Sequence, residues 1–149
     1  MLPKNAWKRV SYFAGIIIGS TFLLLGVYLF VHSSKYPRHV VLGYTRYDIE
    51  VSDTEEKRRE GLSKRASLCQ NCVMLFVFPQ KGRFAFGMQD MQFPIDIIWL
   101  QDDIVVKIER NISPSSGALF RPEEESNRVL EMNAGDSEAL RIGDRVWYE

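Results

Sequence analysis

The chain contains two regions with different patterns of apolar and polar residues. From Val10 to Ser34 there are 25 residues without Asp, Glu, Lys or Arg, and most of them are apolar. A transmembrane helix needs about 20 predominantly apolar residues, so the pattern predicts a membrane-spanning helix over residues 10–32. After this stretch, short apolar runs alternate with charged and turn-forming residues, which is typical of a folded domain.

The predicted membrane helix has the features of an uncleaved signal anchor. A cleaved secretory signal, the alternative, has an apolar core of about 7 to 15 residues followed by small residues at the cleavage site. Here the core is longer, and the VHSSKYP that ends it is a poor site. Because Lys4, Lys8 and Arg9 precede the helix, the positive-inside rule assigns residues 1–9 to the cytoplasm. We therefore expect a single-pass membrane protein whose C-terminal domain is extracytoplasmic.

Residues 33–42 are predicted to be a linker and residues 43–149 a β-rich domain. Apolar and polar side chains alternate in YTRYDIEVSD, as in a half-buried strand. The segment IDIIWL at 95–100 is apolar on both faces of a strand, which predicts burial on both sides. The polar turn QDD follows it, so a β-hairpin is predicted over residues 95–112.

Two short helices complete the predicted domain. In SDTEEKRREG, Ser52 or Asp53 can cap a helix that Gly61 ends, and AGDSEALRIGD reads as a capped helical turn closed by Gly143. The fold class is therefore mainly β, a small antiparallel barrel or sandwich-like domain with two short helices, preceded by one transmembrane helix. Further strands are predicted over 73–78, 83–88, 127–133 and 145–148.

The distribution of charge argues against nucleic-acid binding. All 19 acidic residues follow position 34, together with 16 of the 19 Lys and Arg, which gives the segment from Lys35 onward a net charge of −3. A nucleic-acid-binding domain commonly carries a basic patch that neutralises phosphates. We therefore exclude nucleic acid as the partner.

Two carboxyl groups occupy positions where the neighbouring residues are apolar. Asp96 lies within IDIIWL, and Glu131 lies within RVLEMN. Such a carboxyl is held by backbone N–H groups and an Arg, or it is neutral because its pKa is shifted, or it binds a ligand. The structural alternative, in which each acid ties a turn or pairs with an Arg, is common because structural ion pairs outnumber active sites.

The two cysteines, Cys69 and Cys72, form a C-x-x-C pair. In an extracytoplasmic domain such a pair is usually oxidised, and we expect a local disulfide. A zinc site would need two more ligands, and the chain has no second C-x-x-C or suitably spaced His pair. Exchange-active thiols and unpaired packing residues are the remaining alternatives, and no metal or other cofactor is predicted.

Five blocks of the domain resemble the DUF192 family. They are EVSDTEEKRREGLSKRASL, MLFVFP, FGMQDMQFPIDIIWL, VLEMNAG and IGDRV, in order from about Ile49 to Val146. The resemblance implies a compact, barrel-like β-rich fold and no reaction, because the family name records an unknown function. The chain departs from the family pattern at Val73, Gly87 and Gln89, where Gly, Trp and Lys or Arg are common. Positions that fit the pattern are Arg59, Gly61, Leu62, Arg65, Met88, Pro94, Asp96, Glu131, Asn133, Gly135 and Asp144.

The candidate functional site is a polar pocket built on the two buried acids. In this hypothesis Asp96 and Glu131 accept hydrogen bonds, and an Arg binds an anionic group of a ligand. The leading function is a membrane-anchored module that binds a small ligand or an envelope protein partner. The alternatives are a hydrolase that uses the two acids as general acid and base, and a structural domain that assists assembly of an envelope complex. The predicted pocket comprises Asp96, Glu131, Arg65, Arg59, Met88 and Asn133.

Overall fold

The structure is a computed structural model that describes residues 35–149. The predicted cytoplasmic segment 1–9 and membrane helix 10–32 lie outside the described residues. Within the described part of the chain, no helix is both long enough and apolar enough to span a membrane.

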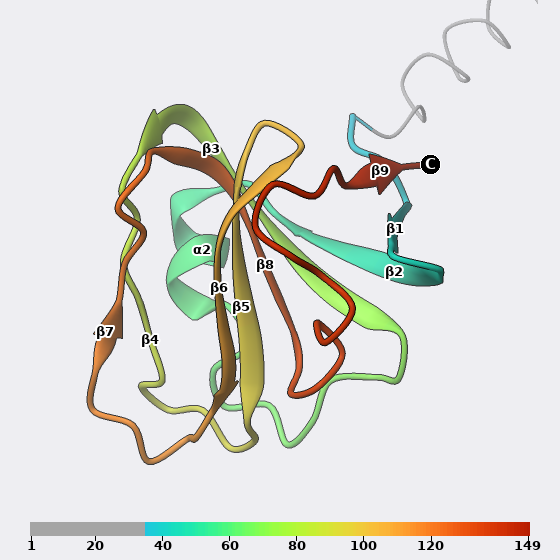
Figure 1. Cartoon of the computed structure of the whole chain (residues 1–149). Coiled ribbons are helices and arrows are strands. Elements are labelled where there is room, and N and C mark those ends of the chain that lie inside the picture. The colour runs from blue at the N-terminus through green and yellow to red at the C-terminus, as the bar shows by residue number, and fades with distance from the viewer. Residues whose placement is uncertain (1–34) are drawn as a thin grey trace, which may run out of the picture. The chain divides into compact units, whose positions relative to one another are not determined.

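The described residues form a mainly β domain around one curled sheet (Figure 1). Seven strands make up this sheet in the order β6-β5-β8-β3-β2-β1-β9, and β4 and β7 form a separate two-stranded ribbon. The elements are β1 His39–Leu42, β2 Thr45–Ser52, α2 Glu55–Glu60, β3 Cys72–Gly82, β4 Phe86–Gly87, β5 Ile95–Gln101, β6 Ile104–Ile112, β7 Leu119–Phe120, β8 Ser126–Asn133 and β9 Trp147–Tyr148.

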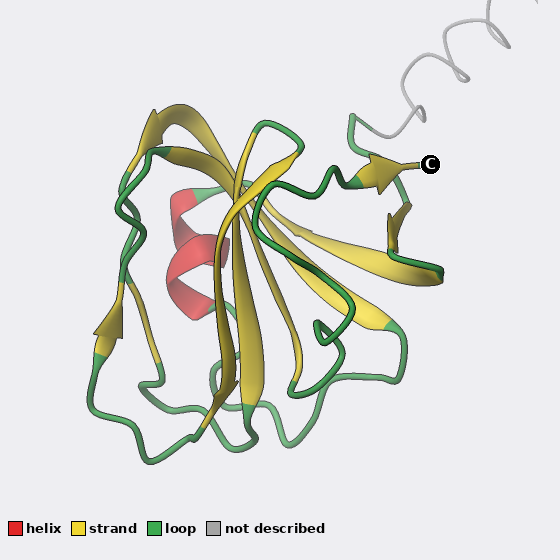
Figure 2. Cartoon of the chain, viewed as in Figure 1, coloured by secondary structure: helices red, strands yellow, loops and turns green. Residues whose placement is uncertain are grey.

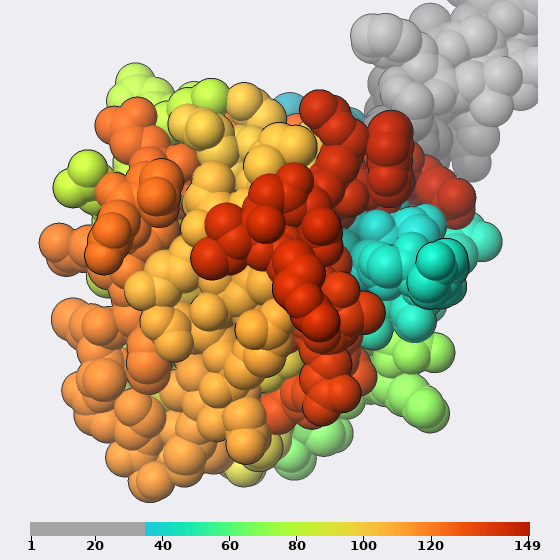
Figure 3. Space-filling view, viewed as in Figure 1, coloured from blue at the N-terminus to red at the C-terminus, as the bar shows by residue number. Residues whose placement is uncertain are grey.

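The sheet is antiparallel except at one pair of strands. β2 and β3 run parallel, and the connection between them contains α2. The C-terminal segment then joins the two edges of the sheet: Val146 N–H donates to the Asp103 carbonyl at 2.8 Å near the start of β6, and β9 pairs with β1. Figure 3 shows this segment, in red, lying across the β5–β6 hairpin. The sheet therefore forms a half-barrel, as the predicted fold class implied.

Apolar side chains pack on both faces of the sheet. On one face, a cluster that includes Ile98, Leu100 and Leu130 is covered by the C-terminal segment, which contributes Leu140 and Val146. On the other face, a second cluster lies beneath the side that carries α2 and the β4–β7 ribbon (Figure 2). It contains Leu62, Leu68, Met74, Phe76, Met88, Ile95, Ile97, Trp99, Ile112 and Val129. Because β5 contributes to both clusters, every residue from 95 to 100 is buried, as its pattern predicted.

Most of the predicted elements are confirmed, and the differences have local causes. The hairpin over 95–112 is present as β5 and β6. The first predicted helix is α2, which Thr54 caps by accepting a hydrogen bond from Lys57 N–H at 3.2 Å, in place of Ser52 or Asp53. The predicted linker 33–42 contains β1, whose short apolar run HVVL pairs with β2.

The second predicted helix, at residues 134–144, is wrong. The segment consists of successive turns in which an N–H donates to the carbonyl three residues earlier, as from Leu140 to Ser137 at 3.0 Å. Gly135, near the start of the segment, has a φ angle of +94°, which an α-helix does not accommodate. The side chains of this segment instead pack on the sheet, as shown for Leu140.

Candidate functional site

Asp96 is a buried hydrogen-bond acceptor within the sheet and does not line an open pocket. Its side chain is 0% exposed, and its Oδ1 accepts a hydrogen bond from Asn111 N–H at 2.7 Å. Oδ2 accepts from Gly135 N–H at 3.1 Å, from Ser137 N–H at 3.1 Å and from the Ser137 hydroxyl at 2.7 Å. Four donors therefore satisfy the buried carboxyl, and they tie both β6 and the C-terminal turns to β5.

The irregularity of the β5–β6 pairing explains why a carboxyl is needed at this position. The register shifts between Ile95 and Ile97, and Asn111, opposite this shift, has a φ angle of +52°. Such a bulge leaves a residue outside the regular ladder. The N–H group of Asn111 therefore donates its hydrogen bond to the Asp96 carboxyl. The carboxyl thus replaces a backbone acceptor.

The structure does not bring Asp96 and Glu131 together. Asp96 pairs with Met132, and Ile97 pairs with Glu131, so the two acids lie on opposite faces of the sheet. The expectation that they line one cleft is therefore not met, and the reason is the two-residue alternation of strands. Glu131 projects toward the face that carries α2 and the β4–β7 ribbon.

Glu131 is buried without a hydrogen-bond partner for one of its oxygens. The residue is 5% exposed, and Oε2 has no partner among the described residues. Burial raises the pKa of the Glu131 carboxyl to about 8, against the opposing effect of the Arg65 guanidinium. A carboxyl with this pKa is mostly protonated at neutral pH, so Glu131 can donate as well as accept a hydrogen bond.

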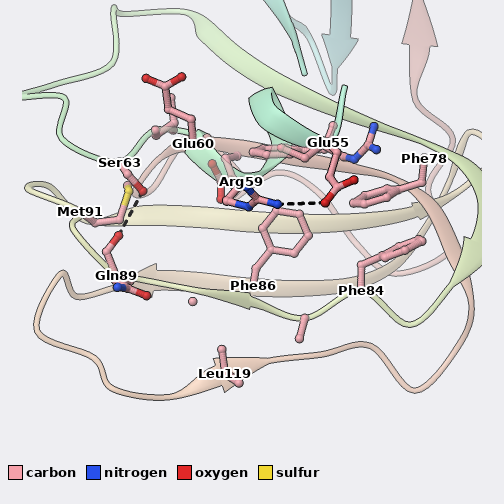
Figure 4. A pocket seen from close by; sticks show the side chains of 17 residues that line it. Glu55, Arg59, Glu60, Ser63, Phe78, Phe84, Phe86, Gln89, Met91 and Leu119 are labelled. Atoms are coloured by element: carbon pink, nitrogen blue, oxygen red, sulfur yellow. Dashed lines mark hydrogen bonds and ion pairs between the residues drawn. The ribbon is translucent and has the colours of Figure 1, made fainter. Parts of the chain in front are cut away.

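The Glu131 carboxyl contributes to the wall of a cavity of about 440 Å³ (Figure 4). Helix α2 lies on one side of the cavity and the β4–β7 ribbon on the other. At one end, the loop after α2 is fastened to the β4–β5 connection, because the Ser63 hydroxyl donates to the Gln89 carbonyl at 3.1 Å. The volume falls within the range of small-molecule pockets.

Phenylalanine side chains form much of the cavity lining. Phe78 and Phe84 stack with ring centroids 3.5 Å apart, and Phe76 meets the edge of Phe86 at 5.0 Å. Behind this group lies the buried Trp99, whose ring packs edge to face with Phe86, with the ring centroids 6.0 Å apart. Its indole N–H donates a hydrogen bond to the Phe84 carbonyl at 2.9 Å. The cavity therefore combines an apolar aromatic surface with one unsatisfied carboxyl oxygen.

The arginines near the cavity are already engaged by the protein. Arg59 lines the cavity and pairs with Glu55 at 2.9 Å. Arg58 donates to the carbonyls of Asp53 and Val77, at 2.7 and 2.9 Å. Arg65 forms a bidentate pair with Glu50, with distances of 2.7 and 2.5 Å. Of the two arginines predicted for the pocket, only Arg59 lines this cavity.

The other two predicted pocket residues, Met88 and Asn133, have structural roles. Met88 is buried in the core cluster on the Glu131 face. Asn133 donates its side-chain amide to the Cys69 carbonyl at 3.1 Å, next to the disulfide that joins Cys69 and Cys72. The predicted disulfide is therefore present, and Asn133 fastens its loop to the end of β8. No cluster of three or more His, Cys, Asp or Glu residues that could hold a metal ion occurs among residues 35–149.

The aromatic residues of the cavity were not among the predicted pocket residues. A signal was available in the two F-x-F repeats, Phe76 with Phe78 and Phe84 with Phe86, because alternate residues of a strand share a face. Met91 also lines the cavity. The sequence pattern does not give the position of α2, which forms the cavity wall beside these rings.

Gly61 allows the chain to leave α2 close to Glu131. Its φ and ψ angles are +53° and −134°, a conformation that essentially only glycine adopts. A Cβ atom added there would lie 3.3 Å from Phe76 Cζ and 3.7 Å from Glu131 Oε2. The end of the helix, the aromatic surface and the unsatisfied carboxyl thus meet at one glycine.

We expect Gly61→Ala to lower the free energy of unfolding by about 1 to 3 kcal/mol, because alanine is strained at this backbone conformation. Urea denaturation of the full chain measures the change. Gly117→Ala is the matched control, since nothing lies within 4 Å of the added Cβ and no such backbone angle applies. Equal stabilities of the two variants would contradict the strained geometry at Gly61.

Comparisons with known proteins agree with this fold. The family model DUF192, described as "Uncharacterized ACR", matches residues 39–148. A crystal structure of a protein of unknown function from Novosphingobium aromaticivorans DSM 12444 is similar, with a TM-score of 0.69 and 26% identity, covering 74% of this chain and 84% of that one.

A second crystal structure shows a similar fold. It is that of a protein from Sinorhizobium meliloti 1021 provisionally named a transcription regulator, with a TM-score of 0.67 and 24% identity, covering 74% of this chain and 90% of that one. Among the curated proteins, none matches this chain. The positions where the sequence departs from the family pattern include Gly87 and Gln89, and both line the cavity.

Proposed function

This chain belongs to the DUF192 family, and we propose that it is a small-molecule-binding domain whose ligand occupies the cavity between α2 and the β4–β7 ribbon. One observation carries the proposal. Glu131 lines a cavity of ligand size, and one of its buried oxygens has no hydrogen-bond partner among the described residues. Since an unsatisfied buried polar group costs about 1 to 3 kcal/mol, a group retained in this state is explained by a ligand that completes its hydrogen bonds.

The geometry supports binding over hydrolysis by paired carboxyls. A general acid and a general base must both reach the same scissile bond. Asp96 and Glu131 point to opposite faces of the sheet, and the donors around Asp96 already satisfy its oxygens. Of these two acids only Glu131 lines the cavity, and it serves ligand recognition in this proposal.

The proposal is tested by comparing Glu131→Leu with the unaltered chain. Leucine removes the hydrogen-bonding group at similar volume, so we expect a fragment that binds the cavity to lose about tenfold or more in affinity. The fold should not be destabilised, because an unpaired polar group is exchanged for an apolar one. Fragment binding is followed by NMR through the indole N–H of Trp99, behind the cavity wall.

Glu138→Gln supplies the control for this experiment. Glu138 is exposed in the C-terminal segment that covers the opposite face of the sheet, so its loss should leave fragment binding unchanged. If no fragment of a diverse library shifts the Trp99 signal, or if Glu131→Leu binds every fragment as well as the original chain, the proposed function is wrong.

We also propose that residues 10–32 anchor the domain to the membrane on the extracytoplasmic side. The long uncharged stretch supports an anchor, and a disulfide persists mainly in oxidising compartments. Because Cys69 and Cys72 are the only cysteines of the chain, a membrane-impermeant maleimide applied to intact cells should label them only after reduction. Labelling that requires permeabilised cells would contradict the topology, and labelling without reductant would contradict the disulfide.

A further inference from the structure

We propose that the cavity selects ligands that carry a protonated primary or secondary amine on an apolar body, with the ammonium group on Glu131 and the apolar body against the phenylalanine rings. The inference rests on the proposed function and names the class of ligand. It follows from the unsatisfied acceptor, the aromatic surface and the balance of charges around the cavity.

The Glu131 carboxyl requires a hydrogen-bond partner that the described part of the protein does not supply. Glu131 Oε2 has no hydrogen-bond partner, and the residue is 5% exposed. The Arg65 guanidinium acts electrostatically on Glu131, and α2 places Glu55, Arg58, Arg59 and Glu60 around the same cavity. The core cluster on this face contributes apolar side chains of β3 and β5. An ammonium group with at least one N–H donates to the free oxygen and pairs with the carboxylate.

The aromatic surface favours a cation as well as an apolar body. The faces of aromatic rings attract cations within about 6 Å of the ring centroid. One ring of this surface already does so, because the Arg58 guanidinium lies 5.1 Å from the centroid of Phe78. Phe76 and Phe86 meet edge to face beside Glu131 and offer further aromatic surface within the same cavity.

Among the described residues, the arginines around the cavity are engaged by the protein, whereas two of its acidic side chains are not. Arg58 is bound to two backbone carbonyls and lies over Phe78, and Arg59 is paired with Glu55. Arg65 is held in its bidentate contact with Glu50. The remaining acidic side chains of the lining are those of Glu60 and Glu131, and Glu131 becomes charged when it releases its proton on binding an ammonium group. An anionic ligand would face these acids without a fully available arginine.

Binding of the amine moves one proton to the solvent. Below pH 8 the Glu131 carboxyl of the free protein is mostly protonated. When a ligand ammonium binds, the carboxyl O–H bond breaks, its proton passes to the buffer, and the carboxylate pairs with the ammonium, which keeps its own protons. The amine therefore binds more tightly as pH rises toward 8, by up to about tenfold per pH unit.

The experiment compares four probes of one shape on the full chain at pH 6.5. They are benzylamine, benzyltrimethylammonium, benzyl alcohol and benzoate, each titrated by calorimetry in two buffers of different ionisation enthalpy. We expect benzylamine to bind at least tenfold more tightly than benzyl alcohol and to release one proton. Benzyltrimethylammonium, which has no N–H, should bind less tightly than benzylamine, and benzoate should bind least.

Two variants separate this inference from the proposed function. Glu131→Gln should lose the preference for benzylamine and the proton release while still binding benzyl alcohol, and Glu138→Gln should keep both. If benzyl alcohol or benzoate shifts the Trp99 signal and binds as tightly as benzylamine, the amine preference is overturned and the small-molecule cavity stands. If no probe and no fragment binds the cavity, both proposals are overturned.

Discussion

Replacement of Asp96 by Ala is expected to lower the free energy of unfolding by about 3 to 5 kcal/mol, the cost of removing one partner from a buried polar network. The substitution leaves the N–H groups of Asn111, Gly135 and Ser137, together with the Ser137 hydroxyl, without their acceptor. Asp96 and Ser137 are both 0% exposed, so water does not replace the lost acceptor at Ser137 without local opening. Urea denaturation of the full chain measures the loss.

Two further variants keep this prediction testable if Asp96→Ala fails to fold. Ser137→Ala removes only the hydroxyl donor and should cost about 1 kcal/mol. Asp96→Asn retains one acceptor oxygen but places an N–H₂ group against donors. The stability of this variant should therefore lie between those of Asp96→Ala and Ser137→Ala. An Asp96→Asn protein as stable as the original would contradict the structural role of the carboxyl.

The second large effect is a loss of stability with rising pH that originates at Glu131. The folded chain holds this proton with a pKa of about 8, and the ordinary value is 4.5. Between these values unfolding releases the proton, so the free energy of unfolding falls by up to about 1.4 kcal/mol per pH unit. The contribution is complete below pH 4.5, is lost as pH rises through 8, and amounts to at most about 5 kcal/mol.

Glu131→Gln isolates this contribution from the other titrating groups. Glutamine has nearly the same shape and does not titrate, whereas Glu50, whose pKa its hydrogen bond with Arg65 lowers, still contributes in the opposite direction. The difference in unfolding free energy between the two proteins should therefore change steadily from pH 5 to pH 8. A difference that is constant over this range would show that Glu131 ionises normally in the folded chain.

The sequence pattern was sufficient for most of the sheet. The apolar character of both faces of residues 95–100 predicted a strand buried on both sides, and the structure places β5 between β6 and β8 with a core cluster on each face. Two-residue alternation and turn residues are local signals, so these strands could be found without knowing the tertiary fold. β7 was missed because it has only two residues, and no local period identifies so short a strand.

The two acids show the limit of the same reasoning for the site. Both were recognised as carboxyl groups in apolar surroundings, and both are buried. Which of them is satisfied depends on groups distant in the sequence: Ser137 lies 41 residues from Asp96 and supplies two donors. The cavity beside Glu131 depends on α2 and the β4–β7 ribbon, whose positions follow from the parallel β2–β3 connection and the docking of loops. The sequence therefore identified a residue of the site but not its surroundings.

The central claim is that Glu131 lines a ligand-sized cavity and holds a buried carboxyl oxygen without a hydrogen-bond partner among residues 35–149. The most direct test is a ¹³C NMR titration of the glutamate side-chain carboxyl groups of the full chain, with the Glu131 signal assigned by its loss in Glu131→Gln. The structure predicts that this one signal titrates near pH 8. A Glu131 signal that titrates near the ordinary value of 4.5 would contradict the account.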